Sequence, residues 1–554
     1  MAIWYIATDG NDTTGDGSKS TPWRHPPVAT TKVGVADGDT FYLAPGNYSE
    51  DATTIWDFAD VAANRRTYTF AKDPAEAGDV VLDTSESDGS TISYLVKLNA
   101  TGTDYTFKNI TFGNTNNTGT FRQIRCYAND FILHFEGCTF DIRSKQSYCL
   151  LCTVSAANRT LTFDDCHWVS TETLGWPKVV CYGLSTYRVS DCSWTTTTEA
   201  PSPFLFLGQH SFGDITLERI AVNAPSSPSV LLSLANGSGH IAFFSSLNSV
   251  TIDTVTGTNG GGLFSIYNSP VEGTQVTVKN NDVALGGLFT GINIGVDDAG
   301  YIADYPIVGA VVENNTIKMT IDRHGISTGM QSDSCIVRYN KVSGGCWNYV
   351  NKGTKNYYHH NTGHGTRMYL DTREGNSGNG TGTTAGRCEH NSFYVTAATG
   401  AAFRHAIRID TIAENSLGGT FKNNIVVFDT TGQAAGDDYA LMQFTYDGDM
   451  RGFEIDYNVY YIPDFTNTLL WRQDATTGVS LVTLQDKEAV IGVVGADAHS
   501  VLSDPGYSSI DLDDATFLEV GRFSPAYRAA SDFPASIGEH QIAKRSSVLG
   551  SAIM

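Results

Sequence analysis

The stretch Phe107-Lys-Asn-Ile-Thr-Phe112 opens a series of thirteen related phrases, which recur about 21 to 35 residues apart. The fourth position of the phrase is apolar or cysteine in the first six copies and asparagine in the last seven. In chain order this column reads Ile110, Cys138, Cys166, Cys192, Ile220, Val255, Asn281, Asn315, Asn340, Asn361, Asn391, Asn424 and Asn458. A repeat of this length is typical of architectures in which each unit packs on its neighbours.

The column predicts that equivalent residues of successive repeats stack directly over one another. Buried asparagines are stable only where each amide bonds to the amides above and below, whereas the apolar half packs by burial. Stacking at the strand spacing of about 4.8 Å gives a shaft of roughly 60 Å. Leucine-rich and β-propeller repeats have no asparagine column. We therefore predict an all-β protein, a right-handed parallel β-helix of about 13 coils.

The composition agrees with this fold class. Hydrophobic residues make up 41% and charged residues 17% of the 554 residues, which is a globular balance. Strand-forming Thr, Val, Ile, Tyr and Phe dominate, and few segments have the pattern of an amphipathic helix. The ten cysteines are too irregularly spaced for a disulfide framework, so we expect buried thiols.

Charge and hydropathy exclude two classes of protein. The formal net charge of −23 argues against a general nucleic-acid binder, which should be basic. No stretch approaches the ~18–20 apolar residues of a membrane span, so no membrane span is expected. Residues 1–10 have neither a basic n-region nor an apolar h-region, so we expect no signal peptide in this chain. The expected location is extracellular or in a virion, with release by cell lysis as one route.

Three segments are predicted along the chain. Residues 1–60 form an N-terminal cap that keeps the first rung from pairing with other chains. Residues 61–462 form the shaft of the β-helix. Residues 463–554 leave the shaft and fold back or mediate oligomerisation.

Both ends of the chain resemble one family. The opening stretches are Trp4-Tyr-Ile-Ala-Thr-Asp-Gly-Asn-Asp12 and Asp37-Gly-Asp-Thr-Phe-Tyr-Leu-Ala-Pro-Gly-Asn-Tyr48, and the closing ones are Gly495-Ala-Asp-Ala-His-Ser500, Ser503-Asp-Pro-Gly-Tyr507 and Phe523-Ser-Pro-Ala526. They are similar to the ends of pectate-lyase-like β-helix proteins, so the likeness covers nearly the whole chain. It implies a right-handed parallel β-helix with a polysaccharide or cell-surface glycan as partner. The activity stays open, because this fold hosts lyases, hydrolases, epimerases and inert fibres.

Ionisable residues concentrate between residues 351 and 410, where basic residues outnumber acidic ones in an otherwise acidic chain. The basic residues are Lys352, Lys355, Arg367, Arg373, Arg387, Arg404 and Arg408, and the acidic ones are Asp371, Glu374, Glu389 and Asp410. Lys352 lies twelve residues after Asn340, and Arg373 lies twelve residues after Asn361. If the asparagines stack, the two cations lie on adjacent rungs roughly 4.8 Å apart and repel unless an anion binds them. A uronate carboxylate or an acidic side chain could be that anion.

A second, local resemblance concerns the same cluster. Asn351-Lys-Gly-Thr-Lys-Asn356, Asn361 and Asp371-Thr-Arg-Glu-Gly375 resemble the Lys…Asn…Asn…Arg-x-Gly stretch of the alginate lyase and chondroitinase B family. The resemblance implies that Lys352 abstracts the proton α to a uronate carboxylate and that Arg373 is its partner in β-elimination. The donor of the second proton stays open among Arg373, His324, His364, Tyr349 and Tyr369. Substrate contacts are expected from Lys355, Arg367, Tyr369, Asp371, Glu374, Arg404 and Arg408.

That family commonly holds calcium through acidic residues just before the lysine. The corresponding stretch here, Gly345-Cys-Trp-Asn-Tyr349, contains no carboxylate. Calcium therefore stays an open alternative, but the sequence shows no ligands for it. We assign no metal ligand and no other cofactor. Zinc-type spacings of Cys and His, a Gly-rich phosphate loop and a Gly-x-Ser-x-Gly elbow do not occur in the sequence.

Two alternatives remain open. One is a glycoside hydrolase with two carboxylates about 5 to 10 Å apart, for which the candidates are Asp322, Asp333, Asp371, Glu374 and Asp410. The other is a non-catalytic phage tailspike, fibre or decoration protein, or an adhesin, that binds a surface glycan. It would form a homotrimer and contact other virion proteins.

Overall fold

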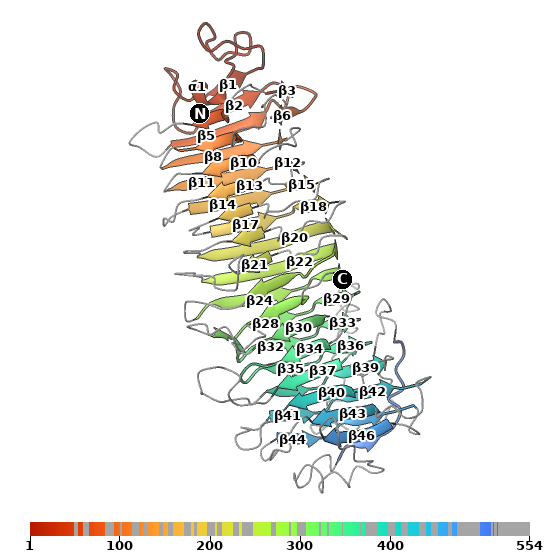
Figure 1. The fold of residues 1–554 in the computed structure, drawn as a ribbon. Helices are drawn as coiled ribbons and strands as arrows, with labels where there is room; N and C mark the ends of the chain where they lie inside the picture. The colour runs from red at the N-terminus through yellow and green to blue at the C-terminus, as the bar shows by residue number, and fades with distance from the viewer. Residues whose placement is uncertain are drawn as a thin grey trace, which may run out of the picture. The chain divides into compact units, whose positions relative to one another are not determined.

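The computed structural model describes most of the repeats and the N-terminal end of the chain (Figure 1). The described residues are 1–48, 54–58, 66–83, 93–99, 102–113, 121–126, 130–142, 148–152, 159–170, 179–181, 186–196, 205–207, 213–224, 232–234, 248–266, 273–286, 290–295, 306–320, 323–329, 332–345, 347–365, 367–371, 386–396, 405–410, 419–431, 439–444, 453–463, 468–473, 499–510, 514 and 518. They form two compact units. Unit 1 comprises Met1–Ser265, Ser269–Thr274 and Gly286–Phe289, and unit 2 comprises Ile266–Asn268, Gln275–Leu285 and Thr290–Met554.

In each unit the strands form two parallel sheets, which we call the corner sheet and the side sheet. The corner-sheet strands of unit 1 are β1 (Ile3–Ile6), β2 (Thr40–Leu43), β3 (Gly46–Asn47), β5 (Arg66–Lys72), β6 (Val80–Leu82), β8 (Thr103–Lys108), β9 (Ile110–Phe112), β11 (Phe131–Glu136), β12 (Thr139–Ile142), β14 (Arg159–Asp164), β15 (His167–Ser170), β17 (Thr186–Ser190), β18 (Ser193–Thr196), β20 (Asp214–Ala224) and β22 (Ser249–Asn259). Its side-sheet strands are β4 (Thr54–Phe58), β7 (Ser93–Leu98), β10 (Phe121–Cys126), β13 (Tyr148–Cys152), β16 (Val179–Cys181), β19 (Leu205–Leu207) and β21 (Leu232–Leu234). The short helix α1 (Pro26–Ala29) belongs to the same unit, and β23 (Phe264–Ile266) spans the point in the sequence where the unit ends.

Unit 2 repeats the arrangement. Its corner-sheet strands are β24 (Gln275–Lys279), β25 (Asp282–Leu285), β28 (Val311–Glu313), β29 (Thr316–Met319), β32 (Ile336–Arg338), β33 (Lys341–Ser343), β35 (Tyr357–His359), β36 (Thr362–His364), β38 (Arg387–Glu389), β39 (Ser392–Thr396), β41 (Gly419–Lys422), β42 (Ile425–Asp429), β44 (Phe453–Asp456), β45 (Val459–Tyr461) and β47 (Val501–Leu502). Its side-sheet strands are β26 (Ile292–Ile294), β30 (His324–Thr328), β34 (Trp347–Asn351), β37 (Arg367–Asp371), β40 (His405–Asp410), β43 (Tyr439–Phe444) and β46 (Thr468–Gln473), and β27 (Ile307–Val308) pairs with β31 (Ser332–Asp333). This stacking of short parallel strands confirms the predicted right-handed parallel β-helix.

The core of unit 1 is built on phenylalanines that stack from rung to rung. Strand β8 alternates buried and partly exposed residues, as a side-chain period of two requires. Phe107, Phe135 and Phe163 are paired in register on β8, β11 and β14. Their ring centroids lie 5.5 and 5.0 Å apart, and all three side chains are fully buried. Each stacked pair contributes about 0.5–1.5 kcal/mol beyond the burial of its area.

The core of unit 2 contains the predicted asparagine ladder. Six hydrogen bonds of 2.7–3.3 Å join the Nδ2 of one asparagine to the Oδ1 of the next, from Asn281 to Asn458. Asn340 also donates from Nδ2 to the carbonyl of Val312 at 2.9 Å and from its backbone N–H to the Oδ1 of Asn361 at 3.1 Å. The ladder residues are at most 1% exposed. The change from the apolar column to the asparagine column coincides with the change from unit 1 to unit 2.

A left-handed residue turns the chain at every copy of the phrase, which the sequence analysis missed. The third position has a φ between 51° and 62° in all thirteen copies, namely Asn109, Gly137, Asp165, Asp191, Arg219, Thr254, Asn280, Asn314, Tyr339, His360, His390, Asn423 and Tyr457. This conformation costs most side chains roughly 1–2 kcal/mol, and Gly, Asn and Asp less. Seven of the thirteen copies have one of these three residues, so their enrichment was the available signal.

The cysteines form two columns in unit 1. Cys138, Cys166 and Cys192 are buried thiols of the corner sheet, as expected. A second column, not predicted, pairs Cys126 with Cys152 and Cys152 with Cys181 in the side sheet. Burial raises the pKa of the Cys166 thiol well above its usual value, which makes it a poor nucleophile.

Parallel strand pairing extends beyond both predicted boundaries of the shaft. Strand β1 already pairs with β2 within the predicted cap. Strands β46 and β47 continue the parallel pairing beyond residue 462, the predicted end of the shaft. Most of residues 463–554 lies outside the described residues, so fold-back or oligomerisation of this segment stays a prediction.

Candidate functional site

The side sheet of unit 2 brings several predicted residues together. Its register pairs Val350 with Tyr369 and Tyr369 with Arg408, on β34, β37 and β40. Arg408 is partly exposed between the buried Ile407 and Ile409, so it lies on the outer face of the sheet. In the same strands Asp371 pairs in register with Asp410. Both residues are candidate carboxylates of the hydrolase alternative.

Lys352 directly follows β34 on this sheet. It is partly exposed, and its backbone N–H donates to the carbonyl of Thr328 at 2.8 Å. Because Asn351 pairs with Leu370, the next position along the strands places Lys352 beside Asp371. The neighbouring Lys355 is exposed and has a left-handed backbone with a φ of 52°.

The predicted pairing of Lys352 with Arg373 assumed that equal spacing from the asparagine column gives equal register in the side sheet. The register contradicts that assumption. Asn351 lies eleven residues after Asn340, but its partner Leu370 lies only nine residues after Asn361. A β-bulge between Trp347 and Tyr349 causes part of this shift. Three of the predicted site residues, Arg373, Glu374 and Arg404, lie outside the described residues, as does Asp322.

Arg367 is held by aromatic neighbours at the other end of these strands. Its guanidinium lies over the Trp347 ring, 4.0 Å from the centroid, and its Nη1 donates to Nε2 of His405 at 3.4 Å. The rings of Trp347 and His405 lie 5.5 Å apart. Arg367 is 5% and His405 7% exposed. The arginine therefore fixes the two rings and offers little surface to a substrate, a cation–π arrangement that sequence reasoning did not find.

Two of the predicted proton donors, His324 and His364, lie away from Lys352, whereas Tyr369 pairs with Val350, two residues before it. His324 begins β30 and Thr328 ends it, so His324 and Lys352 are separated by most of a strand, roughly 13 Å. His364 lies on β36 of the corner sheet, with its ring 5.5 Å from that of Tyr394.

Tyr349 is a core residue. Its side chain is fully buried, and its Oη lies 3.0 Å from the carbonyl oxygen of Asn340 and 2.8 Å from that of Thr362. Burial, with a smaller contribution from Tyr358, raises its pKa well above the usual value. A glycan on the surface cannot reach this hydroxyl, which corrects its predicted role as a proton donor.

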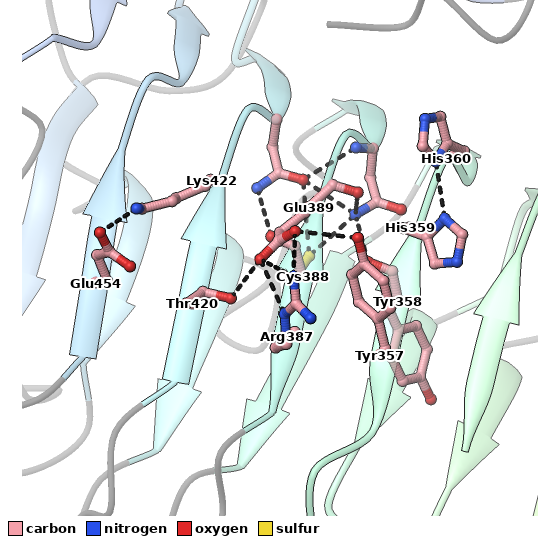
Figure 2. A network of polar contacts seen from close by, with 12 residues as sticks. Tyr357, Tyr358, His359, His360, Arg387, Cys388, Glu389, Thr420, Lys422 and Glu454 are labelled. Carbon is pink, nitrogen blue, oxygen red and sulfur yellow. Dashed lines mark hydrogen bonds and ion pairs between the residues drawn. The ribbon is translucent and has the colours of Figure 1, made fainter. Parts of the chain in front are cut away.

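A polar network on the corner sheet of unit 2, centred on Glu389, was not predicted as a site (Figure 2). The Glu389 carboxylate accepts hydrogen bonds from Tyr357 Oη at 3.0 Å, Thr420 Oγ1 at 2.9 Å and Arg387 Nη2 at 2.9 Å. The Arg387 guanidinium also lies over the Tyr357 ring, 4.3 Å from its centroid. These residues come from the neighbouring strands β35, β38 and β41, which pair in register.

Glu389 is ionised although it is only 9% exposed. Burial acts to raise its pKa, but the hydrogen bond from Thr420, the charge and hydrogen bonds of Arg387 and the Tyr357 hydroxyl outweigh burial. The net result is a pKa below the usual value for glutamate. The carboxylate is therefore a fixed acceptor and a poor general acid.

A depression of about 410 Å³ lies beside this network, lined by Arg387, Glu389, His390, Thr420, Lys422, Asn423 and Glu454. Lys422 and Glu454 form an ion pair across β41 and β44. On the corner, the rings of His360 and His390 are nearly parallel, with centroids 5.0 Å apart. The site thus combines charged hydrogen-bonding groups with aromatic rings, the composition of many ligand sites.

The signal for this network is in the second position of the repeated phrase. Across unit 2 that column alternates in charge, apart from one histidine, and reads Lys279, Glu313, Arg338, His359, Glu389, Lys422 and Asp456. The asparagine register that predicted the ladder also places these residues side by side. Applying it to the second position would have placed Glu389 beside Lys422. The partners Tyr357, Arg387 and Thr420 pair in register at the position just before the phrase.

Within the described ranges, no group of three or more His, Cys, Asp or Glu side chains is placed to hold a metal ion. No helix in the described part of the chain is long and apolar enough to cross a membrane. Comparison with models of known protein families found no match, and comparison with curated proteins found none either.

Proposed function

We propose that the protein binds an acidic polysaccharide on the outer face of the side sheet of unit 2 and cleaves it by β-elimination. The observation that supports this most is the placement of Lys352 and Arg408 on neighbouring parts of that face, in a chain with a net charge of −23. The net negative charge of the protein repels a uronate at long range, so a binding site for it needs positively charged residues nearby. Membership of the pectate-lyase-like superfamily is part of the same proposal.

In the proposed reaction the side-chain amine of Lys352 removes the proton α to the uronate carboxylate. The electron pair forms a carbon–carbon double bond as the glycosidic C–O bond at the β carbon breaks. Arg408 provides a fixed positive charge for a carboxylate of the bound chain. Tyr369, which pairs in register with Val350, or solvent supplies the proton to the leaving oxygen, whereas Tyr349 is buried and His324 lies roughly 13 Å along the strands.

The test is incubation with alginate, pectate and chondroitin, followed by the ultraviolet absorbance of unsaturated uronate. We expect product from at least one substrate, with Lys352→Ala losing at least a hundredfold in rate. Lys318→Ala is the matched control, since this partly exposed lysine lies on β29 of the corner sheet, outside the proposed site, and should retain activity. Absence of product from all three substrates, or equal loss in both variants, would contradict the proposal.

Binding without cleavage, as in a virion fibre or adhesin, is the second candidate. It is favoured by the burial of Tyr349, a predicted proton donor, and by the buried packing of Arg367 against Trp347 and His405. In that case the wild-type protein retains polysaccharide in affinity electrophoresis but releases no product. Light scattering of the same sample would then be expected to give a trimer.

A further inference from the structure

We propose that the depression beside Glu389 is a second glycan site, on the corner sheet of unit 2, and that it binds a neutral hexose unit. The site lies on a different sheet from Lys352, so the inference does not depend on the proposed cleavage. Its volume of about 410 Å³ falls within the ~300–1,000 Å³ typical of small-molecule sites.

The charge of the site selects a neutral ligand. Arg387 is paired with Glu389 at 2.9 Å, and Lys422 is paired with Glu454, so two cations are balanced by two anions. A polyuronate would gain attraction from one partner and repulsion from the other. A neutral sugar can instead bridge the partners, because each hydroxyl both donates and accepts hydrogen bonds.

Glu389 acts here as a positioning residue. Its oxygens already accept from Tyr357, Thr420 and Arg387, and its side chain is nearly buried. These bonds fix the guanidinium of Arg387, whose side chain is 50% exposed. The groups that remain accessible to a hexose are therefore on Arg387 and on the Glu454 carboxylate, which is 58% exposed.

The corner residue His390 supplies an aromatic ring beside the sugar site. His390 lines the depression and stacks at 12° on His360, and both have left-handed backbones. Histidine, like asparagine and aspartate, adopts this left-handed conformation more readily than most other side chains. The corner can therefore hold the His390 ring at the edge of the depression.

The test is isothermal titration calorimetry of the full chain with maltotetraose, cellotetraose and mannotetraose, and with tetragalacturonate. We expect at least one neutral tetrasaccharide to bind more tightly than tetragalacturonate to this site. Arg387→Ala and Glu454→Gln should each weaken that binding at least tenfold. Arg338→Ala is the matched control, because Arg338 forms a similar ion pair with Glu313 on the same sheet outside the depression.

Three results would overturn the inference: no binding of any neutral tetrasaccharide, unchanged affinity in both Arg387→Ala and Glu454→Gln, or equal loss in Arg338→Ala. Circular dichroism confirms that each variant is folded. The cleavage assay separates the two proposals. Arg387→Ala should cleave polyuronate like the wild type, and Lys352→Ala should bind the neutral sugar like the wild type.

Discussion

Glu389 shows how one buried charge depends on residues from neighbouring strands. The hydrogen bonds and the charge of Arg387 outweigh burial and hold the folded pKa of Glu389 below the usual value for glutamate. A carboxyl of this kind stabilises the fold above the unfolded pKa, and that contribution disappears as the pH falls through the folded pKa. Its stabilising effect should therefore be present at neutral pH and lost in acid.

We predict that Glu389→Gln lowers the free energy of unfolding by about 1–3 kcal/mol at pH 7, because the hydrogen bonds of an ionised acceptor are lost. The difference from the wild type should shrink at about pH 3.5. Urea unfolding of the wild type and the variant at both pH values measures this difference in free energy of unfolding. Glu313→Gln, in the ion pair with Arg338, is the control and should change stability by less than about 1 kcal/mol. A pH-independent difference would refute the assignment.

Single site residues were predicted less well than their neighbourhood. The sequence named Tyr369 and Arg408 as separate candidates, and the register pairs them on β37 and β40. The sequence did not reveal that Tyr349 is fully buried or that Arg367 is enclosed by Trp347 and His405. Burial depends on which loops and strands cover a side chain, and residue type alone does not determine that.

At the scale of the element, the two halves of the column stabilise their units by different forces. An asparagine rung is held by hydrogen bonds between buried amides, and an amide that loses its partner stays buried and unpaired. A cysteine rung is held by the burial of a small side chain. Replacing one member of each column therefore has unequal consequences.

We predict that Asn340→Ala lowers the free energy of unfolding by about 2–5 kcal/mol, since the Nδ2 and backbone N–H of Asn315 lose their shared acceptor and Asn361 loses its side-chain donor. Cys166→Ala in unit 1 should cost only about 1 kcal/mol. Denaturant unfolding followed by circular dichroism measures both. Equal effects would mean that the asparagine ladder contributes no more than packing.

The corner sheet was predictable from the sequence because its repeat is constant. One left-handed residue and one ladder residue follow each other in every copy, so counting from the ladder gives the register of both flanking strands. The side sheet was not predictable in this way. Segments of unequal length separate its strands from the ladder, and a bulge at Trp347 and Tyr349 shifts the count.

At the scale of the whole molecule, each unit is a stack in which residues 19 or more positions apart in sequence become neighbours. The cluster at Glu389 and the face with Lys352 both depend on that stacking in unit 2. In-register parallel pairing is therefore the central claim of the account, and both functional proposals fail without it.

Disulfide trapping between β28 and β32 tests this claim most directly. Val311 and Ile336 are register partners, so Val311→Cys with Ile336→Cys places two thiols on adjacent rungs about 4.8 Å apart at the backbone, within disulfide range. Val311→Cys with Arg338→Cys is offset by two residues, roughly 8 Å, and is the control. After mild oxidation, mass spectrometry of unreduced digests should find the cross-link in the first variant and not in the second. No cross-link in the first variant, or equal cross-linking in both, would contradict the account.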